Sequence, residues 1–332
     1  MLIVNTKKYG YSEEYGIIIK KKNYKEEEKM EMHNNTELKN SPNKSLMVLW
    51  AFLIMLIHMI ALVIGQMISL IIYMIIDVAN GTLGIGDGVF TYEGNHIGVL
   101  DLTYLYSAKS VVLSVIIATP IVLMAVYLIY VRLLKEKEVL LMSANGKSTI
   151  NTILGFLAGI AIWFPITFIV SNTFIGNLSE EHTRIMNDAL DMTPLWLSII
   201  GVAIFAPIIE EIAYRGIVQG FLEKMIRNPF IVILIQALLF GVVHMNLQQF
   251  IYAAGVGLIL GLIRYWTKSI WPCILAHISF NLSGLIIYRV NPDLSGQTFL
   301  IISAISLFTS NLALQSSVPC KMSEKESAVI VS

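Results

Sequence analysis

Long apolar runs alternate with short polar connections along most of this chain. A run of about 17–25 apolar residues is long enough to cross the hydrocarbon core of a bilayer as a helix. Eight segments reach or approach this length, so the pattern predicts an all-α, polytopic membrane protein with about eight transmembrane helices. The predicted spans are residues 46–76, 110–134, 149–174, 194–214, 229–246, 249–266, 270–289 and 298–314.

Polar segments flank this apolar region. The first 45 residues are polar and charged, and they lack the apolar core that is typical of a secretory signal. We predict a polar cytoplasmic N-terminal tail (1–45), one transmembrane domain (46–315) and a cytoplasmic C-terminal tail (316–332).

The composition supports a membrane protein. The chain is 56% hydrophobic and only 14% charged, whereas soluble domains carry about 25% charged residues. The formal net charge is zero, which gives no reason to expect nucleic acid as a partner. The two cysteines, Cys273 and Cys320, suggest neither a disulfide framework nor a cysteine-ligated zinc.

The basic residues of the connections alternate along the chain. Lysines are frequent in the N-terminal tail, residues 77–108 contain no Lys or Arg, and residues 175–193 contain Arg184 alone. Basic residues return between these segments at Arg132, Lys135, Lys137 and Lys147, and later at Lys224, Arg227, Arg264 and Lys268. Because cytoplasmic loops are enriched in Lys and Arg, this pattern predicts a multi-pass protein of the cell membrane with both termini in the cytoplasm.

Three polar patterns interrupt the apolar runs of the last third. They are Glu210-Glu211-x-x-x-Arg215, Phe240-x-x-x-His244 and His277-x-x-x-Asn281. An ionisable group within a bilayer costs on the order of 2.5–3.5 kcal/mol on insertion scales, so it marks a functional site by default. Their occurrence on successive segments predicts one assembled site.

Helical spacing divides these residues into three roles. Glu211 and Arg215 are separated by four positions and can form an ion pair, whereas Glu210 lies about 100° around the helix without that partner. A partly desolvated carboxylate can serve as a general base, and His244 can share its work.

The third pattern has the composition of an oxyanion pocket. His277 and Asn281 project from one helical face, and each side chain can donate a hydrogen bond to a developing oxyanion. Together with the carboxylate base, these donors favour hydrolysis of an amide by activated water.

In this order, the three motifs resemble those of the CAAX prenyl protease and bacteriocin-processing (CPBP, also called Abi) intramembrane endopeptidases, over about residues 200–285. The resemblance implies that Glu210 and His244 activate water, that His277 and Asn281 form the oxyanion pocket, and that Glu211 and Arg215 support them. It also implies eight spans and a cavity open to the cytosol. Eukaryotic members cut prenylated CaaX tails, whereas prokaryotic relatives are tied to peptide maturation, self-immunity or protein anchoring.

The sequence therefore predicts a metal-independent endopeptidase without a cofactor, acting from the cytoplasmic side on a membrane-associated protein or peptide in the lipid bilayer. Two alternatives stay open. A zinc protease could use Glu210 or Glu211 with His244 and His277 as ligands, although no His-Glu-x-x-His motif is present. A transporter or an immunity protein could use the same buried charges without catalysis.

One difficulty concerns the depth of the site. If a straight helix begins at Pro229, His244 lies about 22 Å along it at 1.5 Å per residue. Glu210 is expected nearer the cytoplasmic end of its own span. The site can therefore assemble only if one helix tilts, breaks or starts deep in the membrane.

Overall fold

The computed structural model describes residues 44–86, 89–128 and 146–290. The chain divides into two units, Met1–Met47 and Val48–Ser332, and nearly all of the described residues belong to the second. The predicted span 298–314, the C-terminal tail 316–332 and all but the last two residues of the N-terminal tail lie outside the described residues.

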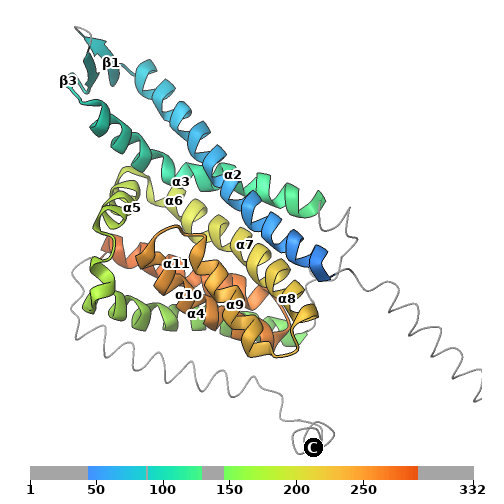
Figure 1. Ribbon diagram of the computed structural model, residues 1–332. Coiled ribbons are helices and arrows are strands. Elements are labelled where there is room, and N and C mark those ends of the chain that lie inside the picture. The colour runs from blue at the N-terminus through green and yellow to red at the C-terminus, as the bar shows by residue number, and fades with distance from the viewer. Residues whose placement is uncertain (1–43, 87–88, 129–145, 291–332) are drawn as a thin grey trace, which may run out of the picture. The chain divides into compact units, whose positions relative to one another are not determined.

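The prediction of an all-α, polytopic membrane fold is confirmed (Figure 1). Within the described residues, six helical segments are long and apolar enough to cross a membrane. One of them, from Leu195 to Met225, is an unbroken run of five shorter elements. The other five are formed by α2 (Lys44–Ala79), α3 (Val99–Val126), α4 (Gly146–Asn172), α10 (Leu247–Thr267) and α11 (Trp271–Val290).

The segment predicted as the loop 77–108 contains two features that the apolar pattern missed. It holds a small antiparallel sheet, in which Glu93 and Gly94 take positive φ angles of 49° and 78° at the β2–β3 turn, as a tight two-residue hairpin requires. The second span also begins at Val99 rather than at residue 110. The strands are β1 (Leu83–Gly86), β2 (Val89–Tyr92) and β3 (Asn95–His96).

Polar residues near the start of α3 interrupt its apolar run, so the predicted span begins too late. Ser110 donates a hydrogen bond to the carbonyl oxygen of Tyr106 at 2.7 Å, so its hydroxyl is satisfied inside the helix. The Lys109 ammonium lies 2.6 Å from Asp77 of α2 and 3.0 Å from the hydroxyl of Tyr92 in β2. These contacts join α2, α3 and the sheet.

The predicted loop 175–193 is also largely helical. It contains η3 (Phe174–Asn177) and α5 (Glu180–Met192), an amphipathic helix that packs against α3. Because its residues are mostly polar, a prediction based on the length of apolar runs does not detect α5, although its apolar residues recur at helical spacing.

The fifth predicted span, 229–246, is wrong in length. Helix α9 runs only from Pro229 to Val242. Fourteen residues extend about 21 Å, which is less than the roughly 30 Å of hydrocarbon in a bilayer. The chain then turns through Met245, which has a φ of 53°, and the side chain of Asn246 caps α10 by accepting from Gln249 N at 3.0 Å.

Helices α4 and α11 approach each other closely through glycines. A Cβ atom at Gly155 would lie 2.4 Å from the carbonyl oxygen of Pro272, and one at Gly159 would lie 1.9 Å from that of Ala276. Ser279 of α11 donates to the carbonyl oxygen of Phe156 in α4 at 2.7 Å. Small residues that let backbones meet are typical of helix pairs in membranes.

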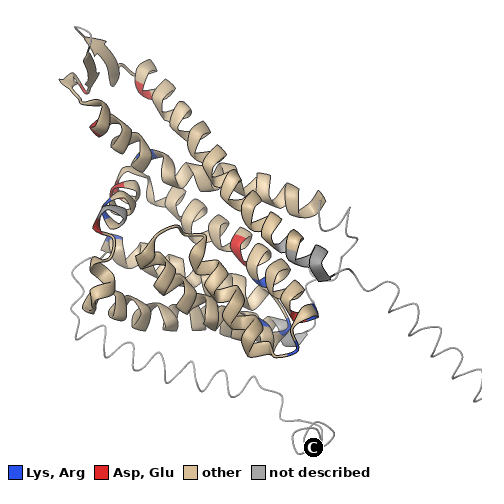
Figure 2. Ribbon diagram, in the orientation of Figure 1, with Lys and Arg blue, Asp and Glu red and all other residues tan. Residues whose placement is uncertain are grey.

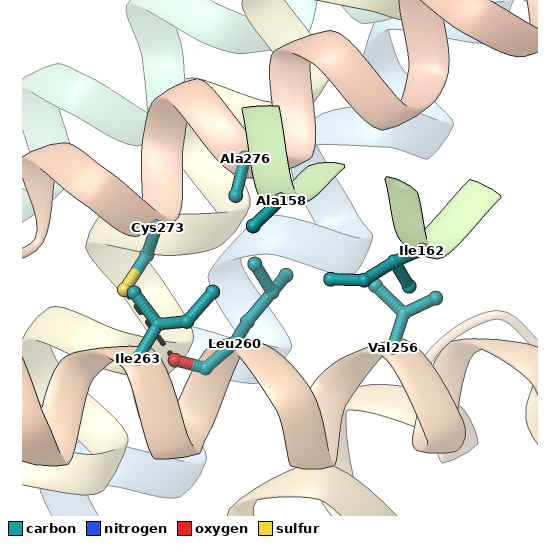
Figure 3. Packing of buried hydrophobic residues seen from close by; sticks show 7 residues of the cluster. All are labelled: Ala158, Ile162, Val256, Leu260, Ile263, Cys273 and Ala276. Carbon is teal, nitrogen blue, oxygen red and sulfur yellow. Dashed lines mark hydrogen bonds between the residues drawn. The ribbon is translucent and has the colours of Figure 1, made fainter. Parts of the chain in front are cut away.

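A hydrophobic cluster between α4, α10 and α11 extends this contact (Figure 3). The thiol of Cys273 points across the cluster and donates to the carbonyl oxygen of Leu260 at 3.4 Å. The cluster holds α11 in position between its two neighbours. Its members are Ala158, Ile162, Val256, Leu260, Ile263, Cys273 and Ala276.

The close approach of α4 and α11 predicts a large effect of a single methyl group. Gly159→Ala should destabilise the protein by about 1–3 kcal/mol, because overpacking forces the backbones apart. Thermal unfolding in detergent measures the effect. Gly255→Ala is the matched control, because a Cβ atom at this position meets only Ile166 Cδ1 at 3.7 Å. This variant should unfold at the same temperature as the unmodified protein. Equal stability of the Gly159→Ala and Gly255→Ala variants would contradict the packing argument.

Candidate active site

One cavity of about 320 Å³ brings the three motifs together. Its wall includes Glu210, Phe240, His244, His277 and Asn281. These residues come from α7 (Ala206–Glu210), from α9 and the turn that follows it, and from α11. The structure therefore places all four predicted catalytic side chains around a common space.

Helix α9 is shorter than the straight span from which the difference in depth was expected. Because α9 ends at Val242, His244 lies in the turn that follows the helix. The His244 ring is held there by Nδ1, which lies 2.8 Å from the carbonyl oxygen of Phe240. One of the geometries that the sequence required, a broken span, is thus present.

The Glu211 carboxylate links the first motif to the third. Its Oε1 atom lies 2.7 Å from Nη1 of Arg215 and 2.9 Å from Nδ1 of His277. The Glu211 and Arg215 side chains are both 0% exposed. The predicted ion pair is present, and it has a third member that spacing along one helix did not suggest.

Glu210 faces the cavity instead of the ion pair. Its side chain keeps a small exposed fraction, 15%, and its Oε2 atom lies 3.7 Å from Nε2 of His277. The two nitrogens of His277 thus face two different carboxylates, Glu211 through Nδ1 and Glu210 through Nε2. Glu210 is left accessible to a water molecule in the cavity.

Phe240 is the aromatic centre of the site. The guanidinium carbon of Arg215 lies 4.3 Å from the centre of the Phe240 ring, within the range of a cation–π interaction. The rings of Tyr214, His244 and His277 meet Phe240 edge-on, at centroid distances of 5.1, 5.1 and 5.9 Å. This residue of the second motif therefore contacts the first and the third.

Asn281 contacts an irregular part of the neighbouring helix. Its Nδ2 donates to the carbonyl oxygen of Val202 at 2.9 Å. Val202 lies in η4 (Ile199–Phe205), one of two π-helical stretches that flank α7; the other is η5 (Glu211–Val218). Widened turns of this kind are frequent at functional sites.

Both predicted oxyanion donors are therefore engaged in this structure, His277 Nδ1 with Glu211 and Asn281 Nδ2 with Val202. Asn281 keeps a second amide hydrogen that can serve a ligand, and Nε2 of His277 can also donate when the imidazole is protonated. The geometry is compatible with the predicted pocket, but the two side chains also have structural partners.

The rest of the cavity wall could not be found from motifs. Trp163 comes from α4, Met186 and Leu190 come from α5, and Gln249 and Tyr252 come from the start of α10. These residues lie in separate elements without a recognisable spacing. Only the packing of the helices identifies them.

Within the described residues, no three His, Cys, Asp or Glu side chains are arranged to hold a metal ion. His244 and His277 each use Nδ1 for a contact inside the protein and leave Nε2 for the cavity. The ligand set that the zinc alternative requires is not assembled among these residues.

Comparisons with known proteins fall on the segment that carries the motifs. Residues 192–283 match the family model described as "Type II CAAX prenyl endopeptidase Rce1-like". A Bacillus subtilis (strain 168) protein named "Putative membrane peptidase YdiL" is 33% identical over 113 residues, which make up 34% of this chain and 45% of that protein. The chain thus matches less than half of this relative, and no solved structure matches.

The buried ion pair predicts that the stability of the protein depends strongly on Arg215. Arg215→Met should destabilise the protein by about 3–5 kcal/mol, because the Glu211 charge would be left buried without its main partner. The double variant Glu211→Gln, Arg215→Met should recover part of this loss. Chemical unfolding in detergent measures all three proteins.

Lys268→Met is the control for this experiment, because Lys268 is exposed and its replacement should change stability by no more than about 0.5 kcal/mol. If Arg215→Met is as stable as Lys268→Met, the ion pair does not support the site.

Proposed function

We propose that this chain, whose residues 192–283 match the family model of type II CAAX prenyl endopeptidases, is an intramembrane endopeptidase. It hydrolyses a peptide bond in a membrane-associated protein or peptide. The observation that carries the proposal is the convergence of Glu210, His244, His277 and Asn281 on one cavity inside the apolar helices. The family match and the peptidase relative support the same reaction.

In the proposed reaction, Glu210 is the general base. It takes a proton from a water molecule in the cavity as the water oxygen attacks the scissile carbonyl carbon. The carbon–nitrogen bond then breaks, and the leaving amine receives a proton from Glu210 or through His244. The products are a carboxylate and an amine, so the water is consumed and the base is regenerated.

His277 and Asn281 would stabilise the oxyanion that forms during the attack. A protonated His277 would donate from Nδ1 to Glu211 and from Nε2 to the oxyanion. The Glu211 carboxylate fixes the ring orientation for this purpose, and hydrogen-bond donors held in place before the reaction are worth more than mobile ones. Arg215 supports Glu211 and does not contact the substrate.

The catalytic residues can be tested with matched pairs of variants. Glu210→Gln and His244→Ala should each lower the cleavage rate by about 10²–10⁴-fold, the usual contribution of general acid–base catalysis, while the protein remains folded. Comparative proteomics of membrane peptides from cells with wild-type or variant protein identifies the cleaved products. Full cleavage by either variant would contradict the assignment.

Glu93→Gln and His96→Ala are the controls for these variants. Both residues are exposed at the turn and third strand of the small sheet, outside the cavity wall. They repeat the same chemical changes away from the site, and they should leave cleavage unchanged.

The zinc alternative makes a separate prediction. Because the described residues assemble no three-ligand group, cleavage should persist after chelation, and purified protein should contain no stoichiometric zinc. Elemental analysis and the cleavage rate after dialysis against a chelator measure this. Loss of activity on chelation, with recovery on adding zinc, would instead favour the metalloprotease.

A further inference from the structure

The connections between helices gather at two ends of the unit Val48–Ser332. We call one the hairpin end; it contains the small sheet, η3, α5 and the α9–α10 turn. We call the other the basic end; it contains the α8–α9 and α10–α11 connections and the start of α4. Helix α8 comprises Gln219–Met225.

Side-chain contacts define the hairpin end. Asn246 in the α9–α10 turn donates to the hydroxyl of Ser179, just before α5, at 2.6 Å. The guanidinium carbon of Arg184 in α5 lies 4.5 Å from the ring centre of Tyr104, near the start of α3. The sheet, α5 and the turn that carries His244 therefore share one end.

Contacts likewise define the basic end. Gln219 at the start of α8 donates to the carbonyl oxygen of Gly261, in the second half of α10, at 3.3 Å. Gly155 near the start of α4 faces Pro272 at the start of α11. The connections that follow α8 and α10 therefore lie together with the beginning of α4.

Lys and Arg residues lie at both ends, as Figure 2 shows for the described part. The connections at the two ends nevertheless differ in how many basic residues they contain. Arg184 is the single Lys or Arg in the sequence of the hairpin-end connections, residues 80–98, 173–194 and 243–246. Arg289, in the last turn of α11, adds a second positive charge at this end, where it donates to the carbonyl oxygens of Leu190 and Thr193.

The basic end has Lys224 in the last turn of α8, Arg264 in the last turn of α10, and Arg227 and Lys268 in the connections that follow these helices. In the sequence, the segment that leads into α4 contains four more basic residues, Arg132, Lys135, Lys137 and Lys147. By the positive-inside rule, the basic end is cytoplasmic and the hairpin end is not.

The cavity lies toward the hairpin end. Its wall takes Gln249, Tyr252, Ala253 and Val256 from α10, all within the first half of that helix. From α11 it takes His277 and later residues, up to Leu285 near the end of the helix. Met186 and Leu190 of α5, which belongs to the hairpin end, complete the wall, and α8 contributes no residue to it.

We propose that this cavity opens toward the extracytoplasmic face, so that the scissile bond belongs to an extracytoplasmic segment of a membrane-anchored protein or peptide. This inference rests on the proposed peptidase function. It opposes the cytosolic opening that the family resemblance implies, because the charge distribution and the position of the cavity point to the other side.

Labelling of single cysteines tests the sidedness without relying on catalysis. In a Cys273→Ala, Cys320→Ala background, the reporters Leu100→Cys and Phe174→Cys lie at the hairpin end, where the native side chains are 85% and 72% exposed. Arg227→Cys and Lys268→Cys lie at the basic end. A membrane-impermeant maleimide should label the first pair in right-side-out vesicles and the second pair in inside-out vesicles.

Gln249→Cys tests the opening of the cavity itself, because Gln249 lines the wall. A charged, impermeant methanethiosulfonate should modify it at least tenfold faster from the outside than from the cytoplasmic side. The opposite ratio, or labelling of the hairpin-end reporters only in inside-out vesicles, overturns the proposal.

Failure of the peptidase proposal would be seen separately. It would appear as unchanged cleavage in Glu210→Gln, and it would leave these labelling patterns unaffected.

Discussion

One carboxylate oxygen, Oε1 of Glu211, holds the candidate site together. It receives hydrogen bonds from Arg215 on its own helix and from His277 on α11. Charges this deeply buried are tolerated only when they are paired, so the contact constrains how the two helices pack. The Arg215 guanidinium in turn lies against Phe240, which brings α9 into the same assembly. Residues from all three motifs are therefore connected through side chains that do not take part in the proposed reaction.

Irregular helices give this assembly its geometry. The segment Leu195–Met225 contains two π-helical stretches around α7, and the carbonyl oxygen of Val202 in the first accepts from Asn281. Helix α9 stops before it could cross a bilayer, and His244 lies in the turn beyond its end. Interrupted helices are tolerated at membrane depth where the backbone is buried in protein or lines a cavity. Both deviations from regular geometry lie beside the cavity.

The position of the cavity disagrees with one implication of the family resemblance, the side of the membrane on which the cavity opens. The motifs resemble those of peptidases whose cavity is expected to open to the cytosol, whereas the Lys and Arg pattern is the basis for our proposal that the cavity of this chain opens to the opposite face. The two arguments depend on different residues, since the motif side chains lie around the cavity and the basic residues lie in the connections and the last turns of helices. The two proposals together describe a peptidase that uses the reaction implied by the resemblance on a substrate that arrives from the extracytoplasmic side.

The sequence by itself determined the class of fold, most of the spans and the chemical identity of the candidate site. Apolar length and helical spacing are local properties, so they predicted the all-α membrane fold and the Glu211–Arg215 pair. They could not reveal that α3 begins at Val99, because Lys109 and Ser110 are compensated by partners elsewhere in the structure. Only the tertiary structure decided that Glu210 and His244 share a cavity and that His277 bonds to Glu211. Those facts depend on where α9 ends and on how closely α4, α10 and α11 pack, which are contacts between residues far apart in the chain.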